Sequence, residues 1–331
     1  MSEQTIEQVT ESCAWRARDF TGRDQWARPF TPAMVEEIDG ALRRAVGAGL
    51  SYDALTRENF PLPLTEPLLA DARAELDEGA GFAVLSGFPV ERYSFAQNQL
   101  VFCGVSAYLG AIADQSHTRV KLQDVIDQGM PYDAHSRAYK SNAYIPFHTD
   151  GCDVTGLFCL APAAEGGESL IVSAAAIYNA VKVSRPDLLK TLSRGFRYHR
   201  RGEHGAGEGP VSEHHLPVFS FANGLFSATY NRYPIEWAQK EIGALPADEL
   251  AALDLLDEIA NRPEMHMRMD FQQGDMQFVN NHVVLHSRTA YCDDSDHRRH
   301  LLRIWLNIPD SRRDGLTTVT LFAPWAQRGA Q

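Results

Sequence analysis

The sequence predicts one α+β domain that is built around a double β-sheet or a barrel. Helical patterns are concentrated toward the N-terminal half of the chain, whereas strand-like runs dominate the rest of it. Helices and strands that are segregated in this way are typical of α+β domains, while α/β folds alternate them. No linker divides the 331 residues, so we expect a single domain over 1–331.

Three helices are expected in the N-terminal half, over residues 31–46, 66–78 and 95–109. Thr31 is a capping residue for the first, Pro32 suits its first turn, and apolar residues recur at helical spacing along it. Gly79 is a stop signal for the second helix, and Ser94 caps the third. GFAVLSGF at 81–88 is a short apolar run that is typical of a buried strand.

The remaining chain is rich in strands. Strand-like segments occur at 143–160, 166–173, 216–230, 264–271, 277–286 and 300–307. Helical turns are expected at 174–182 and 186–193, and Pro246 opens a helix over 247–260. In EMHMRMDF (264–271) the methionines and Phe271 alternate with polar residues, a period of two that indicates a half-buried strand. The polar, glycine-rich segment RGEHGAGEG at 202–210 predicts a mobile loop and a candidate lid.

His148 and Asp150 form the single His-x-acid pair in a chain that has 12 histidines and 43 acidic residues. Residues i and i+2 of a strand share a face, so both side chains can reach one metal ion. Chance alone gives about one or two such pairs at ordinary composition. A buried histidine that is hydrogen-bonded to the aspartate is the alternative, and the pair by itself leaves both interpretations open.

A second segment, NNHVVLHSR at 280–288, supplies further imidazoles along an apolar strand. His286 lies 138 positions after His148 (286 − 148). His282, four residues earlier on the expected strand, shares the face of His286 and is a rival ligand on spacing alone. Two histidines and one carboxylate with open positions are typical of non-haem Fe(II) oxygenases. The alternative for either histidine is a core imidazole with satisfied hydrogen bonds.

Arg299 and Arg303 stand four apart on the next expected strand and so share a face with Leu301 and Trp305. Arginine is costly to bury unless a carboxylate pairs with it, and it binds carboxylates through two parallel hydrogen bonds. A bound organic acid and a structural ion pair are both consistent with this pattern. For Arg288, which shares the face of His286, we expect a structural pairing.

Charge and cysteine usage argue against several partners. The formal net charge of −12 disfavours nucleic acid, which requires a basic surface. No apolar run approaches the roughly 18 residues of a membrane span, and the N-terminus lacks the apolar region of a signal peptide. Five cysteines without a CxxC pair predict a reduced, cytoplasmic protein. We expect a small-molecule partner, and the sequence leaves the oligomeric state open.

Several segments, taken in order, resemble the taurine/2,4-D dioxygenase (TauD/TfdA), clavaminate synthase-like family of Fe(II)/2-oxoglutarate oxygenases. They are GFAVLSGFPV, FHTDGCDVTGLFCL, the GGES turn, FQQGDMQFVNNHVVLHSRTAY and RRHLLRIWL. The resemblance implies a double-stranded β-helix (jelly-roll, cupin-like) core over 81–307 with inserted helices, a helical flank over 1–80 and a tail over 308–331. It also implies Fe(II) as the cofactor and 2-oxoglutarate and O2 as cosubstrates.

Carried onto this chain, the family pattern makes His148, Asp150 and His286 the iron ligands. It selects His286 over His282, because the distal ligand precedes an H-x-R and lies 13 positions before the first strand arginine, Arg299 (299 − 286).

The same resemblance assigns residues to the cosubstrate. Arg299 matches the arginine that holds the distal carboxylate of 2-oxoglutarate. Ser169 stands where relatives often place a threonine that contacts the same group. Arg303 matches a second arginine, which contacts either the cosubstrate or an acidic group of the substrate.

The resemblance implies oxidation, most simply hydroxylation, of an unactivated C–H bond in a small organic substrate, with decarboxylation of 2-oxoglutarate to succinate. An amino acid or another carboxylate suits Arg303, while Asn142 and Tyr144 are the candidate substrate contacts just before the metal strand. Because Asp150 is retained, halogenation that needs a vacant carboxylate position is not expected. The alternatives are desaturation, cyclisation or epoxidation at the same iron, or a metal-binding jelly-roll hydrolase or isomerase.

Overall fold

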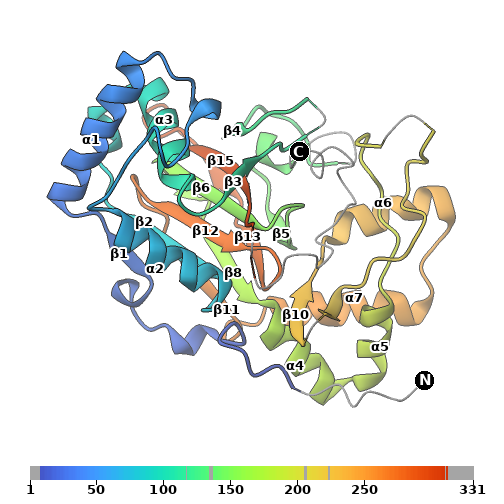
Figure 1. Ribbon diagram of the computed structural model, residues 1–331. Coiled ribbons are helices and arrows are strands. Elements are labelled where there is room, and N and C mark those ends of the chain that lie inside the picture. Colours follow the sequence, from blue (N-terminus) through green and yellow to red (C-terminus); the bar gives the residue numbers. More distant parts are fainter. Residues whose placement is uncertain are drawn as a thin grey trace.

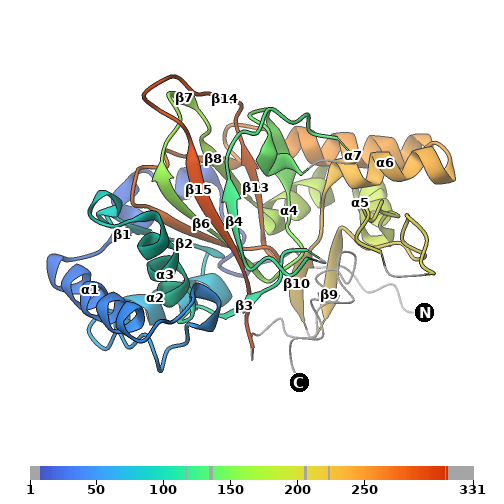
Figure 2. The ribbon, with the colours of Figure 1, turned by 90° about the horizontal axis from the view of Figure 1, so that it is seen from above.

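The computed structural model describes residues 8–116, 118–133, 137–204, 207–222, 224–309 and 311 of the chain. Two β-sheets form its centre, with helices on both sides (Figure 1). Helices α1 (Pro32–Gly47), α2 (Glu66–Asp77) and α3 (Phe95–Ser106) lie beside the larger sheet. Helices α4 (Ala174–Ser184), α5 (Pro186–Arg194), α6 (Arg232–Ile242) and α7 (Ala247–Ala260) gather on the other side (Figure 2).

The larger sheet has seven strands in the order β1-β2-β12-β6-β15-β3, with β4 also paired to β15. These strands are β1 (Ala27–Pro29), β2 (Phe82–Ser86), β3 (Ala111–Ala113), β4 (Leu122–Val125), β6 (Val154–Ala161), β12 (Met276–Asn280) and β15 (His300–Asn307). Every pair is antiparallel except β1 with β2. Strands from both halves of the chain therefore lie side by side in it.

The smaller sheet has four antiparallel strands in the order β11-β8-β13-β5. They are β5 (Ile145–His148), β8 (Ser169–Ser173), β11 (His266–Met269) and β13 (Val284–Arg288). Two further pairs are β9 (Phe219–Ala222) with β10 (Leu225–Ala228), and β7 (Glu165–Gly166) with β14 (Tyr291–Cys292). The α+β organisation that the sequence predicts is present.

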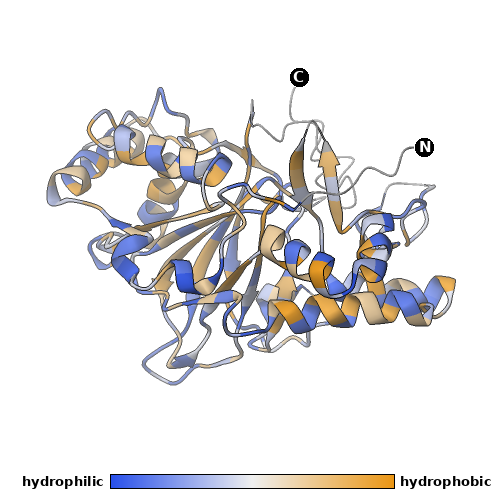
Figure 3. Cartoon of the chain, turned by 90° about the horizontal axis from the view of Figure 1, so that it is seen from below, coloured by the Kyte–Doolittle hydropathy of each residue, from blue (hydrophilic) through white to orange (hydrophobic). Residues whose placement is uncertain are grey.

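Alternation along β15 separates a hydrophobic core from an internal cavity. Leu302, Ile304 and Leu306 are buried in a cluster with residues of α1, α2 and α3. Arg303, between them, faces a cavity that is lined by residues of both sheets. Successive side chains of a strand point to opposite faces, so one strand serves both environments. Figure 3 shows mostly apolar central strands, whereas the helices alternate apolar and polar segments.

The three N-terminal helices and the strand at 81–88 are confirmed. The Thr31 hydroxyl accepts a hydrogen bond from the backbone N–H of Met34 at 3.3 Å, so the predicted cap of α1 is formed. Helix α6 was not predicted, because Tyr233 and Pro234 occupy its first turn and are poor helix formers. Its buried residues Ile235 and Ala238 are the helical-period signal that marks it.

The prediction of one continuous strand over 277–286 is wrong. Strand β12 ends at Asn280, the chain turns over residues 281–283, and β13 begins at Val284 in the other sheet. The side-chain oxygen of Asn280 accepts a hydrogen bond from the backbone N–H of His282 at 2.9 Å, a local turn that competes with strand pairing. His282 therefore lies in a turn, and the shared face that made it a rival of His286 does not exist.

Four other expectations concern a membrane span, the cysteines, the division of the chain and a lid. Among the described residues, no helix combines the length and the apolar content that crossing a membrane requires. None of the five cysteines, all of which the structure describes, forms a disulfide, and only Cys292 is exposed. The division into flank, core and tail stays a prediction, because residues 310 and 312–331 of the tail lie outside the described residues. The lid role of 202–210 also stays a prediction, since residues 205–206 lie outside them too.

Candidate active site

Two strands of the smaller sheet bring His148, Asp150 and His286 together. His148 is the last residue of β5 and pairs directly with His286 of β13, so the two imidazole ring centres lie 4.3 Å apart. Asp150 follows two residues after His148, and one ligand atom from each of the three residues lies within 4.8 Å of the others. The antiparallel pairing of β5 with β13 thus brings together two histidines that lie 138 residues apart in the sequence.

The three side chains do not satisfy one another by hydrogen bonding. Nε2 of His148 lies 3.9 Å from Oδ1 of Asp150, and Nε2 of His286 lies 3.8 Å from Oδ2. Both distances are too long for hydrogen bonds. Nδ1 of His148 donates to the carbonyl of Pro146 at 2.8 Å, which leaves the lone pair of Nε2 for a metal. Nδ1 of His286 is buried without a hydrogen-bond partner in the described structure.

The charge state of the three residues suits metal ligation, which requires neutral imidazoles and an ionised carboxylate. Burial and the nearby His148 lower the pKa of His286 to about 3, and burial also lowers the pKa of His148. Burial acts to raise the pKa of Asp150, but Arg303 and the two histidines outweigh it and hold that pKa below its ordinary value. The donor set therefore fits a divalent metal ion of the kind that the sequence predicts.

Neighbouring side chains fix the orientation of Asp150. The Thr155 hydroxyl and the Trp305 indole N–H donate to its Oδ2 at 2.9 and 3.1 Å. Its backbone N–H donates to the Asn281 side chain at 2.9 Å. With Oδ2 engaged in this way, Oδ1 is the oxygen that remains for a metal.

His282 has a structural role. Its Nε2 lies 3.1 Å from Oδ1 of Asp153, and its Nδ1 lies 2.9 Å from the Ser227 hydroxyl. The ring is almost fully buried, and both nitrogens have partners. The structure thus places His286, and not His282, beside His148 and Asp150, as the family pattern selects.

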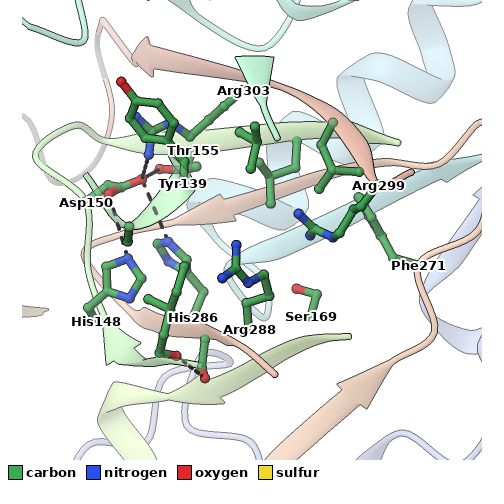
Figure 4. Close-up of a pocket in the computed structure, with 16 residues that line it drawn as sticks. Tyr139, His148, Asp150, Thr155, Ser169, Phe271, His286, Arg288, Arg299 and Arg303 are labelled. Atoms are coloured by element: carbon green, nitrogen blue, oxygen red, sulfur yellow. Dashed lines mark hydrogen bonds and ion pairs between the residues drawn. The ribbon is translucent and has the colours of Figure 1, made fainter. Parts of the chain in front are cut away.

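A cavity between the two sheets opens beside these residues, enclosing about 620 Å³ when its open mouth is counted. Figure 4 shows His148, Asp150 and His286 on one side of it, with Arg288, Arg299 and Ser169 grouped on the other. Its remaining walls are largely apolar and include Val125, Ile145, Leu157, Phe271 and Leu301. We call it the first cavity.

Arg299 supplies an uncompensated charge to the first cavity. Its side chain is buried at 5% exposure, and no ion pair links it to a carboxylate of the described residues. Nη1 has no hydrogen-bond partner there, Nη2 lies a distant 3.5 Å from the carbonyl of Gly167, and the guanidinium sits 5.1 Å from the ring centre of Tyr291. Gly167, at φ +72°, makes room for it, because a Cβ at this position would lie 2.9 Å from Nε of Arg299.

Arg288 is a second buried guanidinium at the same end of the cavity. Nη2 donates to the carbonyls of Ser141 and Ala143, which is the structural pairing expected from the sequence. Nε and Nη1, however, have no partner among the described residues, and the side chain lines the cavity 4.8 Å from the Tyr291 ring centre. Burial and the neighbouring Arg299 lower the pKa of Arg288 to about 10. The H-x-R spacing after His286 is the signal that marks it as a cavity residue.

Ser169 pairs with Arg288 across β8 and β13 and also lines the first cavity. Its hydroxyl lies 2.8 Å from the side-chain oxygen of Gln277. The structure thus places the two residues that the family pattern assigns to the cosubstrate carboxylate, Arg299 and Ser169, on the same side of the cavity (Figure 4).

Arg303 lies at the border of this cavity with a second one. Its Nε donates to the side-chain oxygen of Gln115 at 2.8 Å, and Nη1 lies 3.9 Å from Oδ2 of Asp150. The second cavity shares Ala138, Tyr139, His148, Asp150 and Arg303 with the first. Its further walls are Tyr132, Arg137, Thr149, Gly151, Arg201, Asn231 and Trp305. His148 and Asp150 therefore line both cavities, whereas His286 lines the first of the two.

The structure places Asn142 and Tyr144 away from this site. Both side chains are exposed, and neither lines either cavity. The Tyr144 hydroxyl donates to Asn261 at 3.3 Å, and residues 142–144, just before β5, are all exposed. Two loop arginines, Arg137 and Arg201, do line the second cavity, and no periodic pattern in the sequence marks them.

Most of the chain is similar to known proteins. The model of the family described as "Taurine catabolism dioxygenase TauD, TfdA family" matches residues 45–305. FR-33289 synthase from Streptomyces rubellomurinus is 34% identical over 314 residues, which cover 92% of this chain and 92% of that protein. Taurine hydroxylase-like protein SAT17 from Stachybotrys chartarum is 31% identical over 317 residues, covering 89% and 79%.

Solved structures of two non-haem iron oxygenases are also similar. An asparagine oxygenase in complex with Fe(II), 2S,3S-3-hydroxyasparagine and succinate has a TM-score of 0.66 at 17% identity, over 85% of this chain and 93% of that one. The oxygenase OrfP in complex with Fe and alpha-ketoglutaric acid has a TM-score of 0.64 at 16% identity, over 85% and 94%. The likeness confirms the predicted α+β fold with a jelly-roll core.

Proposed function

The chain belongs to the TauD/TfdA family of Fe(II)- and 2-oxoglutarate-dependent dioxygenases, and we propose that it oxidises an unactivated C–H bond of a small organic acid, most simply by hydroxylation. The observation that carries this proposal is that His148 and Asp150 line both cavities, with His286 beside them in the first, and that each cavity has its own arginines. One cavity suits the cosubstrate, and the other leaves room for a substrate.

In this proposal His148, Asp150 and His286 hold Fe(II) through two imidazole nitrogens and one carboxylate oxygen. When bound, iron with 2-oxoglutarate and O2 supplies the oxidising chemistry, in which the cosubstrate loses CO2 and becomes succinate. The protein's contribution is orientation: Thr155 and Trp305 hold the carboxylate of Asp150 by hydrogen bonds to Oδ2. Three protein ligands leave the remaining positions of the metal open.

We assign the distal carboxylate of 2-oxoglutarate to the end of the first cavity at Arg299, with Ser169 and Arg288 beside it. The unpartnered N–H groups of both arginines support this assignment, because burying a guanidinium without an anionic partner is unfavourable and binding of a carboxylate removes that cost. The apolar walls between these residues and the metal ligands suit the methylene carbons of the cosubstrate. A metal-dependent hydrolase does not need such an arginine, which favours the oxygenase over that alternative.

The substrate is proposed to be an amino acid or another small carboxylic acid. Two solved relatives in fold support this class, since they are complexes with 2S,3S-3-hydroxyasparagine and with (3S)-hydroxy-L-Arg. Arg303, at the border of the two cavities, is the candidate contact for an acidic group of the substrate. Desaturation, cyclisation and epoxidation differ from hydroxylation in substrate pose, with the same protein groups in place.

Anaerobic addition of Fe(II) and then 2-oxoglutarate tests the proposal. The expected result is a weak visible charge-transfer band in the wild type, retained in His282→Ala and lost in His148→Ala. A screen of amino acids and other organic acids for stimulated succinate release then identifies the substrate. The proposal is overturned if no band forms and no member of the screen stimulates succinate release.

A further inference from the structure

A fully buried asparagine, Asn281, lies in the turn that separates β12 from β13. Asn280 is the last residue of β12 that pairs with β6, and the backbone N–H of Asn281 donates to the carbonyl of Asp153 at 2.8 Å. The turn is thereby held against residues 150–155, which lead from the metal-ligand candidate Asp150 into β6. A buried side-chain amide has to find its hydrogen-bond partners in its surroundings, and for Asn281 these surroundings are that segment.

The side-chain amide of Asn281 bonds three groups of residues 150–155. Its Oδ1 accepts a hydrogen bond from the backbone N–H of Asp150 at 2.9 Å. Its Nδ2 donates to the backbone carbonyl of Cys152 and to Oγ1 of Thr155, each at 3.0 Å. A backbone N–H can only donate and a backbone carbonyl can only accept, so these two partners fix which end of the amide is the oxygen. The group that faces Thr155 is therefore an N–H donor.

This polarity decides the direction of the Thr155 hydroxyl. Because Oγ1 accepts from Asn281, the single hydrogen of the hydroxyl is left for Oδ2 of Asp150, to which it donates at 2.9 Å. Figure 4 shows the Thr155 side chain beside this carboxylate. Thr155 is 1% exposed, so water does not compete for either bond. Two consecutive hydrogen bonds thus connect the Asn281 amide to the carboxylate of Asp150.

We infer that Asn281 is a positioning residue for Asp150, which holds the backbone of that residue directly and its carboxylate through Thr155. The inference rests on the proposed function and gives a role to the turn that separates β12 from β13. Because Oδ2 is engaged, the carboxylate offers one oxygen, Oδ1, to the metal. A carboxylate that is restricted in this way occupies one position at Fe(II) and leaves the others to the second protein ligands and the cosubstrates.

The next residue of the turn, His282, provides a matched control. It is as deeply buried as Asn281, and its ring nitrogens are engaged by Asp153 at 3.1 Å and by Ser227 at 2.9 Å. Substituting either turn residue removes buried hydrogen bonds and should lower the unfolding temperature. If the turn served stability alone, the two substitutions would act alike on the metal. The positioning role predicts that only the substitution of Asn281 changes metal binding.

Anaerobic calorimetry of Fe(II) binding is the first measurement. Asn281→Ala removes the whole connection and Thr155→Val only its last bond, and each should weaken Fe(II) binding about tenfold or more. His282→Ala should bind Fe(II) as the wild type does. In the double variant Asn281→Ala/Thr155→Val, the loss of affinity should be smaller than the product of the two single losses, because both residues act on the carboxylate along one connection. Thr155→Ser keeps the hydroxyl and should rescue the binding.

The charge-transfer band of the Fe(II)–2-oxoglutarate complex is the second measurement. A carboxylate that loses a hydrogen bond gives more electron density to the metal, and the band moves charge from the metal to 2-oxoglutarate. We therefore expect the band at longer wavelength in Asn281→Ala and Thr155→Val, and at the wild-type position in His282→Ala and Thr155→Ser.

The outcomes separate this inference from the proposed function. A wild type that gives no band contradicts the proposed function. If the wild type gives the band, the inference alone is overturned when Asn281→Ala matches His282→Ala in both Fe(II) affinity and band position. It is also overturned when Thr155→Val matches Thr155→Ser, a comparison of nearly equal side-chain volumes that decides the question even if Asn281→Ala does not fold.

Discussion

Replacing Arg299 by methionine separates a ligand-binding arginine from a structural one, because the two roles predict opposite effects on stability. Arg299 is buried at 5% exposure, its Nη1 has no partner in the described structure, and its closest carbonyl contact is 3.5 Å long. Burial lowers the pKa of Arg299, which indicates that its charge is unfavourable in the free protein. Arg299→Met keeps most of the apolar volume and removes that charge.

The expected loss of 2-oxoglutarate binding depends on the contacts that the guanidinium offers. Two charge-assisted hydrogen bonds to a carboxylate, at about 1.5 kcal/mol each, amount to about 3 kcal/mol. Since about 1.4 kcal/mol is a factor of ten, the Kd should rise by about two orders of magnitude. At a concentration of about 100 times the wild-type Kd, 2-oxoglutarate stabilises the wild type by about 2.7 kcal/mol, but the variant by only about 0.4 kcal/mol.

Thermal unfolding with and without Fe(II) and 2-oxoglutarate under anaerobic conditions measures both effects. The free Arg299→Met protein should unfold at the wild-type temperature or above it, and the upward shift on adding 2-oxoglutarate should nearly vanish. Arg298→Met is the control, because Arg298 is the exposed neighbour of Arg299 and should behave as the wild type in both respects. A free variant that loses several kcal/mol of stability yet keeps the full 2-oxoglutarate shift would refute the reasoning.

Burial and hydrogen bonding lead to three further predictions. His286→Ala should abolish Fe(II) binding in equilibrium dialysis, whereas His282→Ala should retain it. Because His282→Ala breaks two buried hydrogen bonds, it should lower the unfolding free energy by about 1–3 kcal/mol. Equal loss of Fe(II) binding in both variants would contradict the assignment of the metal ligands. A thiol reagent should label Cys292 rapidly and the four buried thiols only after denaturation. Burial makes these thiols unreactive, and it raises the pKa of Cys103, for example, to about 12. Rapid labelling of two or more cysteines in the native protein would argue against this packing. Burial raises the pKa of Asp275 above 3.8 despite its arginine partner, so between 3.8 and the raised value the folded state binds more protons than the unfolded state. The unfolding free energy should therefore fall as pH rises through that window, and Asp275→Asn should lack this component of the pH profile measured by denaturant titration.

The metal-ligand candidates show how far sequence periodicity reaches. His148 and Asp150 could be placed on one face because a strand has a period of two, and that relation is local. The choice between His286 and His282 could not be made in this way, because the supposed strand breaks at a turn that Asn280 stabilises. The family pattern selected His286, and the structure gives the physical reason: both ring nitrogens of His282 are occupied.

The arginines show the limit of the same reasoning. Arg299 and Arg303 could be placed on one face of a strand, and both line the first cavity. Arg137 and Arg201 could not be found, because they lie in loops, where no periodicity links sequence position to direction. Asn142 and Tyr144 were chosen for closeness in sequence to the metal strand, yet both side chains are exposed on its approach.

Local patterns were therefore sufficient to predict the α+β class, the main helices and strands, the His-x-Asp pair and the family with its cofactor and cosubstrate. These features depend on short-range periodicity and on motifs that are contiguous in the chain. Which arginine faces which cavity required the folded protein, since it depends on strand pairing across more than 100 residues and on loops that pack around the metal ligands. Burial is a property of the whole fold, so the unpartnered charges of Arg288 and Arg299 became visible only when the two sheets were in place.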